Sequence, residues 1–267
     1  MYYAAREDSV LAKRTGIWVW LGVTVAVITV ALLGPRIAQP LSYHNFADQR
    51  GWLGIPNFGD VASNVAFAVV GVWGLMVLVG RAGLVTFVDA RERWPYVLVF
   101  AGMVLVAIGS SYYHLAPDND RLVWDRLPMT IVFMSLVAAM IEERISVLAG
   151  ELILPLLLFV GAFSVFRWHL SEVLGVGDLR FYAAVQAYAI LTLLVILLLP
   201  PRYTRSGDLL AVVGFYVLAK LLETCDRAVF SAGHLVSGHT LKHLAAAAAG
   251  WWILRMLQRR KPIGAID

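Results

Sequence analysis

The chain has 267 residues, of which 60% are hydrophobic and 15% are charged, a composition that excludes an ordinary soluble domain and is typical of a polytopic helical membrane protein. The formal net charge of +4 is better explained by basic loops on the cytoplasmic side of a membrane than by nucleic-acid binding. The single cysteine, Cys225, excludes an intramolecular disulfide and a metal site built from cysteines.

Eight apolar stretches follow one another along the chain, and we expect each of them to be a membrane-spanning helix. They cover residues 17–33, 61–79, 96–113, 127–140, 148–166, 181–199, 209–222 and 239–257. A basic flank precedes the first stretch, but no small-residue cleavage site follows it, so we expect a retained helix and not a signal peptide. The fold class predicted from this pattern is an all-α polytopic membrane helix bundle.

The distribution of Lys and Arg predicts how the spans are oriented. With the amino terminus in the cytoplasm, more of these residues fall in the segments on the inside than in those on the outside. Both termini are then cytoplasmic, and the external ends of the helices carry His114, Asp125, His239 and His243. This clustering is a consequence of the predicted topology, because the histidines played no part in orienting the spans.

Three of these residues have the chemistry of a metal site. His239 and His243 are four positions apart, which puts both rings on one face of a helix, and His114 is expected at the same membrane depth. A catalytic zinc has three protein ligands and an open position for water. The simpler alternative is a set of interfacial histidines that hydrogen-bond to lipid headgroups. His44 and His234 are rival external histidines, but neither has a helical partner at chelating spacing.

Two polar residues near the predicted zinc could take part in hydrolysis. Asp125 would hold the zinc-bound water and accept its proton, although it could also pair with Arg126 or Arg121, or cap the helix that follows. Ser110 could hydrogen-bond the water or the developing oxyanion, although a serine in a membrane helix often bonds its own backbone. Asp226 is expected to orient a ligating histidine.

These motifs in combination resemble those of the alkaline ceramidases, which belong to a wider superfamily of seven-helix membrane hydrolases that includes the adiponectin receptors. The matching residues are Ser110-x-x-x-His114, Asp125-x-x-Pro128-Met129 and His239-x-x-x-His243, with Ser63-Asn64 as a further match in the second span. The likeness covers residues 57–252, and it depends on the three motifs together because each of them is short.

The resemblance implies both the roles of these residues and the reaction. It implies that His114, His239 and His243 are zinc ligands, that Asp125 positions the zinc-bound water, and that Ser110 contacts that water or the oxyanion. The implied reaction is hydrolysis of the amide of ceramide, which releases a sphingoid base and a fatty acid. The residues alone predict only a zinc hydrolase that opens to the membrane; the amide and the sphingolipid come from the resemblance.

The chain departs from the family pattern in two ways. It has one extra amino-terminal span, so we expect three parts: residues 1–58 with that helix and an external segment, a seven-helix zinc hydrolase core at 59–258, and a cytoplasmic tail at 259–267. The eukaryotic enzymes also have an acidic calcium site, of which Asp48 and Asn57 are the only candidate ligands here. Calcium takes roughly six to eight oxygen ligands, which argues against such a site.

The compact loops and short chain are typical of a bacterial member of the family. We therefore expect a protein of the bacterial inner membrane, with its active site toward the periplasm and with ceramide or another N-acyl lipid as its substrate. Two alternatives remain at this stage: a receptor or channel of similar architecture with a structural zinc, and a proton-coupled transporter. Transporters usually consist of two related halves, and the sequence contains no such repeat.

Overall fold

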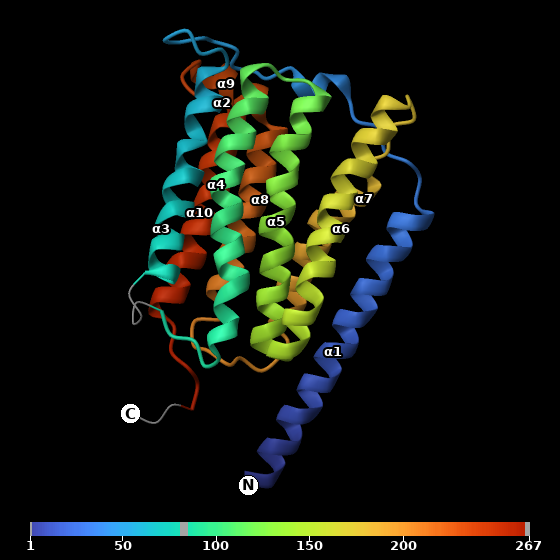
Figure 1. The fold of residues 1–267 in the computed structure, drawn as a ribbon, viewed down its shortest axis with the longest axis vertical. Coiled ribbons are helices and arrows are strands. Elements are labelled where there is room, and N and C mark those ends of the chain that lie inside the picture. Colours follow the sequence, from blue (N-terminus) through green and yellow to red (C-terminus); the bar gives the residue numbers. More distant parts are fainter. Residues whose placement is uncertain (1, 81–84, 265–267) are drawn as a thin grey trace.

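A computed structural model describes residues 2–80 and 85–264 of the chain (Figure 1). Throughout these residues the regular structure is helical, apart from two isolated β-bridges. The helices are α1 (Tyr2–Leu33), α2 (Phe58–Ser63), α3 (Val65–Val79), α4 (Arg93–Leu115), α5 (Asn119–Arg144), α6 (Val147–Val173), α7 (Arg180–Ile196), α8 (Asp208–Thr224), α9 (Asp226–Gly233) and α10 (Gly238–Arg259), with short 3-10 helices η1 (Leu41–His44) and η2 (Ala90–Glu92). The predicted all-α class is therefore confirmed.

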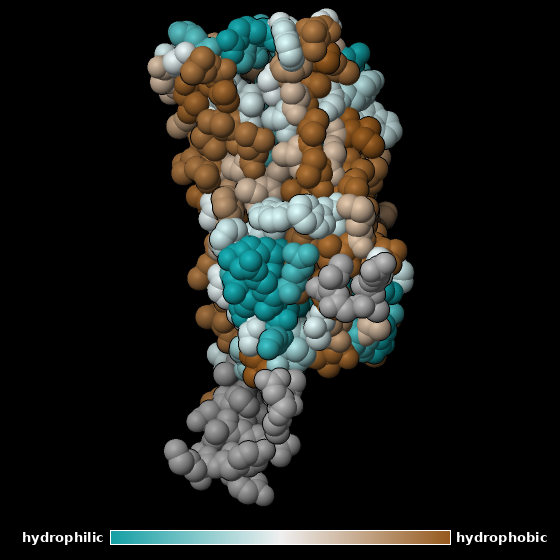
Figure 2. Space-filling model, turned by 90° about the vertical axis from the view of Figure 1, so that its left-hand side faces the viewer, coloured by the Kyte–Doolittle hydropathy of each residue, from teal (hydrophilic) through white to brown (hydrophobic). Residues whose placement is uncertain are grey.

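Several helices have the length and composition of membrane spans. Five described segments are long and apolar enough to cross a membrane: Lys13–Leu33, Phe58–Val79, Ala90–Leu115, Asn119–Arg144 and Val147–Val173. Figure 2 shows a broad hydrophobic surface on the face that contains α3 and α10, with hydrophilic residues toward both ends. Because large apolar side chains of α3 such as Val69 and Met76 are exposed, the bundle has the surface of an integral membrane protein.

The structure corrects two of the predicted helix boundaries. The fourth predicted span begins at Asn119 and not at residue 127, with the Asp118 side chain accepting a hydrogen bond from the Arg121 backbone at its start. Asp125 consequently lies almost two turns inside α5, so the interpretation of this residue as a helix cap is wrong. The second predicted span consists of α2 and α3, which are separated at Asn64.

The packing order brings distant parts of the chain together at one end of the bundle. Helices α3, α4, α5 and α6 each pack against the next, while α10 packs against α8 and α3, and α1 lies at the edge against α7 (Figure 1). Helices α4 and α10 run in opposite directions, so the end of α4 and the start of α10 lie at the same end of the bundle (Figure 1).

One close contact fixes the spacing between α4 and α5. Pro128 has no N–H group, so the carbonyl of Trp124 lacks the hydrogen bond that a regular helix would give it. Gly109 of α4 approaches this carbonyl so closely that a Cβ atom at position 109 would overlap the Trp124 oxygen. The missing side chain thus allows the two helices to approach at the level of Ser110 and Asp125, which follow Gly109 and Trp124 directly.

Candidate metal centre and adjoining cavity

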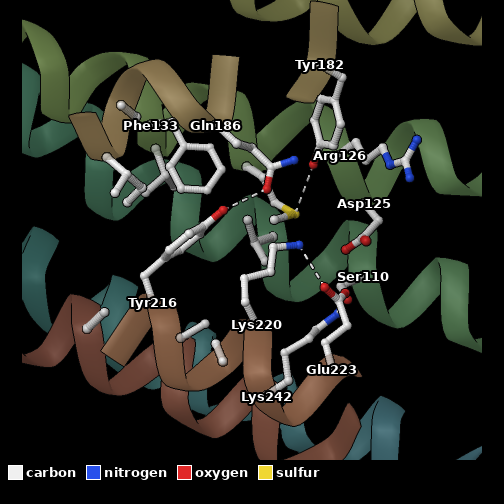
Figure 3. Close-up of a pocket in the computed structure, with 18 of the residues that line it drawn as sticks. Ser110, Asp125, Arg126, Phe133, Tyr182, Gln186, Tyr216, Lys220, Glu223 and Lys242 are labelled. Atoms are coloured by element: carbon white, nitrogen blue, oxygen red, sulfur yellow. Dashed lines mark hydrogen bonds and ion pairs between the residues drawn. The ribbon is translucent and has the colours of Figure 1, made fainter. Parts of the chain in front are cut away.

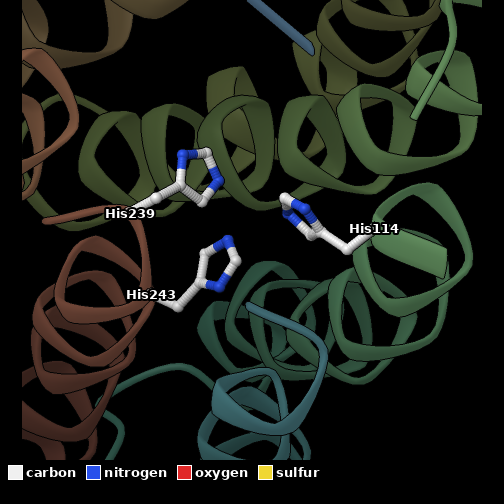
Figure 4. Close-up of side chains that lie close together, drawn as sticks. All are labelled: His114, His239 and His243. Atoms are coloured by element: carbon white, nitrogen blue, oxygen red, sulfur yellow. The ribbon is translucent and has the colours of Figure 1, made fainter. Parts of the chain in front are cut away.

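Three histidine rings meet at the end of the bundle where α4 finishes and α10 begins (Figure 4). His114 belongs to the last turn of α4, while His239 and His243 belong to the first two turns of α10. The Ser237 side chain accepts a hydrogen bond from the Thr240 backbone and so starts α10 just before the first of its two histidines. All three rings are buried, with exposed fractions of 0%, 4% and 3% in sequence order.

The geometry of this group fits a metal ion. One ring nitrogen of each histidine lies within 4.8 Å of the others. The centroid distances are 4.9 Å for His114 to His239, 5.0 Å for His114 to His243 and 5.0 Å for His239 to His243. Three imidazoles on one tetrahedral zinc, with Zn–N bonds of about 2.0–2.1 Å, have ring centroids roughly 5 Å apart. The three residues could therefore hold one metal ion, and zinc is compatible with the spacing.

His114 supplies a second argument for a ligand at this position. Within the described part of the chain, neither of its ring nitrogens has a hydrogen-bond partner, although both are buried. A buried polar atom without a partner is costly, and a metal ion would satisfy one of these two nitrogens. The Phe46 ring, from the long segment before α2, packs at 4.7 Å from His114 and 4.5 Å from His239 between centroids and shields both from solvent.

Two neighbouring side chains orient the histidines of α10. The Ser63 Oγ lies 2.8 Å from Nδ1 of His243, which leaves Nε2 of that ring for a metal. Asp226 accepts hydrogen bonds from the backbone N–H groups of His239 and Ala47, each at 2.8 Å. The predicted role of Asp226 in orienting a histidine thus takes the form of a contact to the backbone and not to the ring.

A charged cluster lies beside His239. Lys242 Nζ is 3.1 Å from Nε2 of His239 and 3.1 Å from Oε1 of Glu223, while Lys220 Nζ is 2.7 Å from Oε2 of Glu223. A cation bound to this histidine nitrogen would repel the Lys242 ammonium, and Glu223 is the partner to which the ammonium would then turn. Burial, followed by the charge of Glu223, raises the pKa of Tyr43 to about 12, so this tyrosine stays a neutral donor to Glu223.

Asp125 and Ser110 line a cavity of about 370 Å³ that also reaches His243 (Figure 3). This volume lies within the roughly 300–1,000 Å³ typical of ligand sites. Both side chains are almost completely buried, and both line the cavity. The far part of the cavity is lined by apolar side chains, among them Met103 and Leu193. Polar side chains therefore meet a hydrophobic compartment beside His243.

The structure also bears on the alternative partners proposed for Asp125. Arg121 lies 3.7 Å from Asp118 and packs over the Tyr112 ring. Arg126 donates a hydrogen bond to Gln39 at 2.6 Å. Neither arginine forms an ion pair with Asp125 among the described residues, so this carboxylate remains available to the cavity.

The residues considered for calcium have other partners. The Asp48 carboxylate accepts two hydrogen bonds from the Arg50 guanidinium, each at 2.8 Å, and this contact lowers the pKa of the Asp48 carboxyl below its usual value. The Asn57 amide donates to the His114 carbonyl at 2.8 Å. The structure therefore pairs each of these side chains with protein groups.

Sequence reasoning missed part of this site. The rival histidine His44 contacts Tyr113 and Asn119 through its two ring nitrogens, at 2.8 and 3.0 Å. Ser63 matched a family motif, but nothing in the sequence around it indicated a contact with His243, 180 positions away. The i, i+3 spacing of Lys220 and Glu223 predicts their ion pair, but not the position of that pair beside the histidines.

Comparison with known proteins does not identify a family for this chain. No family model matches the chain. No curated protein matches it at a significant level.

Proposed function

We propose that this protein is a zinc-dependent amide hydrolase of the membrane, related to the alkaline ceramidases, that cleaves ceramide or another N-acyl lipid. The observation that carries the proposal is the group of three buried histidines, one of which, His243, lines the same largely apolar cavity as Asp125. A hydrolase acting on a lipid needs these two features side by side: a polar reacting centre and a dry compartment for the acyl chain.

The composition of the histidine group favours catalysis over a structural metal. Among the described residues the group contains three histidines and neither a carboxylate nor a cysteine. Structural zinc sites are usually closed by four protein ligands, whereas catalytic sites have three and an open position. A receptor or channel with structural zinc is therefore the less favoured alternative.

The roles of the residues follow from their positions. His114, His239 and His243 would hold the zinc, which when bound supplies a Lewis acid and lowers the pKa of water. Asp125 accepts a proton from the attacking water as the oxygen bonds to the amide carbon, and it returns the proton to the nitrogen as the C–N bond breaks. Ser110 donates a hydrogen bond to the oxygen on which negative charge develops. The products are a free amine and a fatty acid.

The wider architecture belongs to the same proposal. We infer seven helices that form the hydrolase core, at residues 59–258, and an additional amino-terminal span, with both termini in the cytoplasm. The histidines would then lie near the external surface, which is the periplasmic side of a bacterial inner membrane. Helix α1 packs mainly against α7 and contributes no ligand to the histidine group, which is consistent with an addition to a complete core.

The test combines metal analysis with a screen of lipid amides on the purified protein. We expect about one zinc per chain in the wild type, and loss of both zinc and hydrolysis after treatment with a chelator, with recovery when zinc is added back. His239→Ala should remove zinc and activity together. Asp125→Asn should retain zinc and lose activity by roughly 100-fold or more, because the proton acceptor is missing while the ligands are intact.

The control is Asp120→Asn, because Asp120 is an exposed carboxylate on the same helix outside the cavity. This variant should behave like the wild type in both measurements. A wild-type level of amide hydrolysis by Asp125→Asn would show that the proposed mechanism is wrong. Zinc that stays bound in a protein inactive on every lipid amide would favour the structural alternative.

A further inference from the structure

Arg126 is a buried cation in the wall of the cavity, next to the proposed proton acceptor. Its exposed fraction is 4%, and it lines the cavity together with Asp125. Its guanidinium lies over the rings of Trp168, at 4.1 Å, and Tyr182, at 4.7 Å, and one of its nitrogens donates to Gln39 at 2.6 Å. The aromatic rings hold the guanidinium in place, but none of these contacts supplies a negative charge.

The hydrogen bonding of this guanidinium is incomplete. Within the described residues its Nη1 atom is buried and has no partner, and the contacts given above pair Arg126 with no carboxylate. A buried charge without a counter-charge is strongly destabilising, and an unsatisfied donor adds to that cost. A guanidinium carries a fixed positive charge, so this position requires a counter-charge. A ligand that carries an anionic oxygen would supply it.

The other charges of the cavity do not provide that anion. Three basic residues line it, namely Arg126, Lys220 and Lys242, against two acidic residues, Asp125 and Glu223. Glu223 is held by both lysines, and a divalent metal at the histidines would add further positive charge. The polar end of the cavity therefore has an excess of positive charge, which favours a negatively charged ligand over a neutral one.

The position of Arg126 indicates which end of the lipid would carry the charge. Gln39 and Tyr43 come from the external segment before α2, and they line the cavity beside Arg126. The apolar lining, for example Met103 and Ile253, belongs to the middle of α4 and α10. An acyl chain in the apolar part would leave the amine half of the lipid next to Arg126.

We propose that the substrate is an acidic N-acyl lipid, with a carboxylate or phosphate on the amine side of the amide, and that Arg126 binds this anion. The inference rests on the proposed amidase function, and it names the class of substrate within that function. A planar guanidinium suits both anions, because it can offer two parallel N–H groups to two oxygens.

Two matched pairs of lipids test the charge preference. N-palmitoylglycine and N-palmitoylethanolamine have the same acyl chain and differ in a carboxylate against a hydroxyl group. Ceramide 1-phosphate and ceramide differ in the phosphate alone. In neutral detergent we expect kcat/KM for the anionic member of at least one pair to exceed that of its neutral partner by roughly 10- to 100-fold. The pair that shows the difference identifies the anion.

The variants test whether Arg126 causes the preference. Arg126→Gln should lower kcat/KM for the anionic lipid by a similar factor and leave the neutral lipid within about threefold, so that the ratio approaches one. Arg126→Lys keeps the charge and should keep part of the ratio. Arg121→Gln is the matched control, because Arg121 lies on the same helix but outside the cavity. The ratio is measured within each protein, so partial loss of folded protein does not affect it.

A binding measurement separates this inference from the amidase proposal. The same lipids are added to zinc-free protein, and the rise in melting temperature is recorded. The inference is overturned if the wild type cleaves or binds both members of each pair equally, or if the preference is retained in Arg126→Gln. Neither result decides the amidase proposal, which is tested by hydrolysis itself. If no lipid is cleaved but anionic lipids stabilise the wild type and not Arg126→Gln, the anion site is supported and the amidase function fails.

Discussion

Gly109→Ala tests whether the close approach of α4 and α5 positions the proposed catalytic groups, Ser110 and Asp125. A Cβ atom at this position would overlap the carbonyl oxygen of Trp124. A carbon and a carbonyl oxygen pack no closer than about 3.3 Å, so the helices would have to separate by on the order of 1 Å. The separation would move Ser110 away from Asp125, because these residues follow Gly109 and Trp124 in the two helices.

The substitution should change both the turnover rate and the stability of the protein. A displacement of about 1 Å among reacting groups costs roughly 100-fold in rate. Overpacking costs about 1–3 kcal/mol, of which the better helix propensity of alanine offsets about 1 kcal/mol. At roughly 2–4 °C per kcal/mol, the melting temperature should fall by several degrees at most. Zinc content should be unchanged, because the three histidines proposed as ligands lie on α4 and α10 and none lies on α5.

The assay compares turnover of the best lipid amide, zinc content and melting temperature for the variant in detergent. Gly214→Ala is the control: Gly214 is exposed on α8, and an added Cβ there would have no atom within 4 Å. This control should have unchanged turnover and equal or slightly higher stability. The reasoning would be refuted if Gly109→Ala had the turnover of the wild type, since the spacing of α4 and α5 would then not matter for the chemistry.

Two further predictions concern residues outside the ligand set. Ser63→Ala removes the hydrogen bond to Nδ1 of His243 and should weaken zinc binding by roughly 10- to 100-fold, measured by competition with a chelator; an unchanged affinity would contradict the orienting role. Because Arg50 lowers the folded pKa of Asp48, the stability from this pair is fully present above the unfolded value of 3.8 and is lost as the pH falls through the lower folded pKa. The melting temperature should therefore decline more steeply with acid in the wild type than in Asp48→Asn, and equal slopes below about pH 4 would rule this out.

The part of the candidate site that lies on one helix could be predicted from local periodicity. The spacing of His239 and His243 on one helix face follows from the geometry of an α-helix, whatever the rest of the protein does. The match in depth with His114 followed from the predicted direction of each span. The structure does bring the three rings together, and the identity of the metal remains a prediction.

Other features depended on how helices cross, and no local pattern contains that information. The extent of α5, and with it the place of Asp125 inside a helix, depended on polar residues that a hydropathy pattern excludes from a span. The contact of Ser63 with His243 joins positions far apart in the chain. The environment of Arg126 is formed by side chains from the segment between α1 and α2, from α6 and from α7, so its lack of a carboxylate partner could not be read from its neighbours in sequence.

The amino-acid sequence alone predicted an apolar, helical protein with two histidines at a spacing suited to metal chelation. It could do so because hydropathy and the helical repeat are properties of short segments. Three features depended on tertiary packing: the approach of His114 to the other two histidines, the adjoining cavity, and the lack of a carboxylate partner for Arg126. Each of them depends on which helices are in contact and on their relative positions along the bundle. If a determination of the bound state found the three rings turned away from a common ion, the hydrolase proposal would fail and an integral membrane helix bundle would remain.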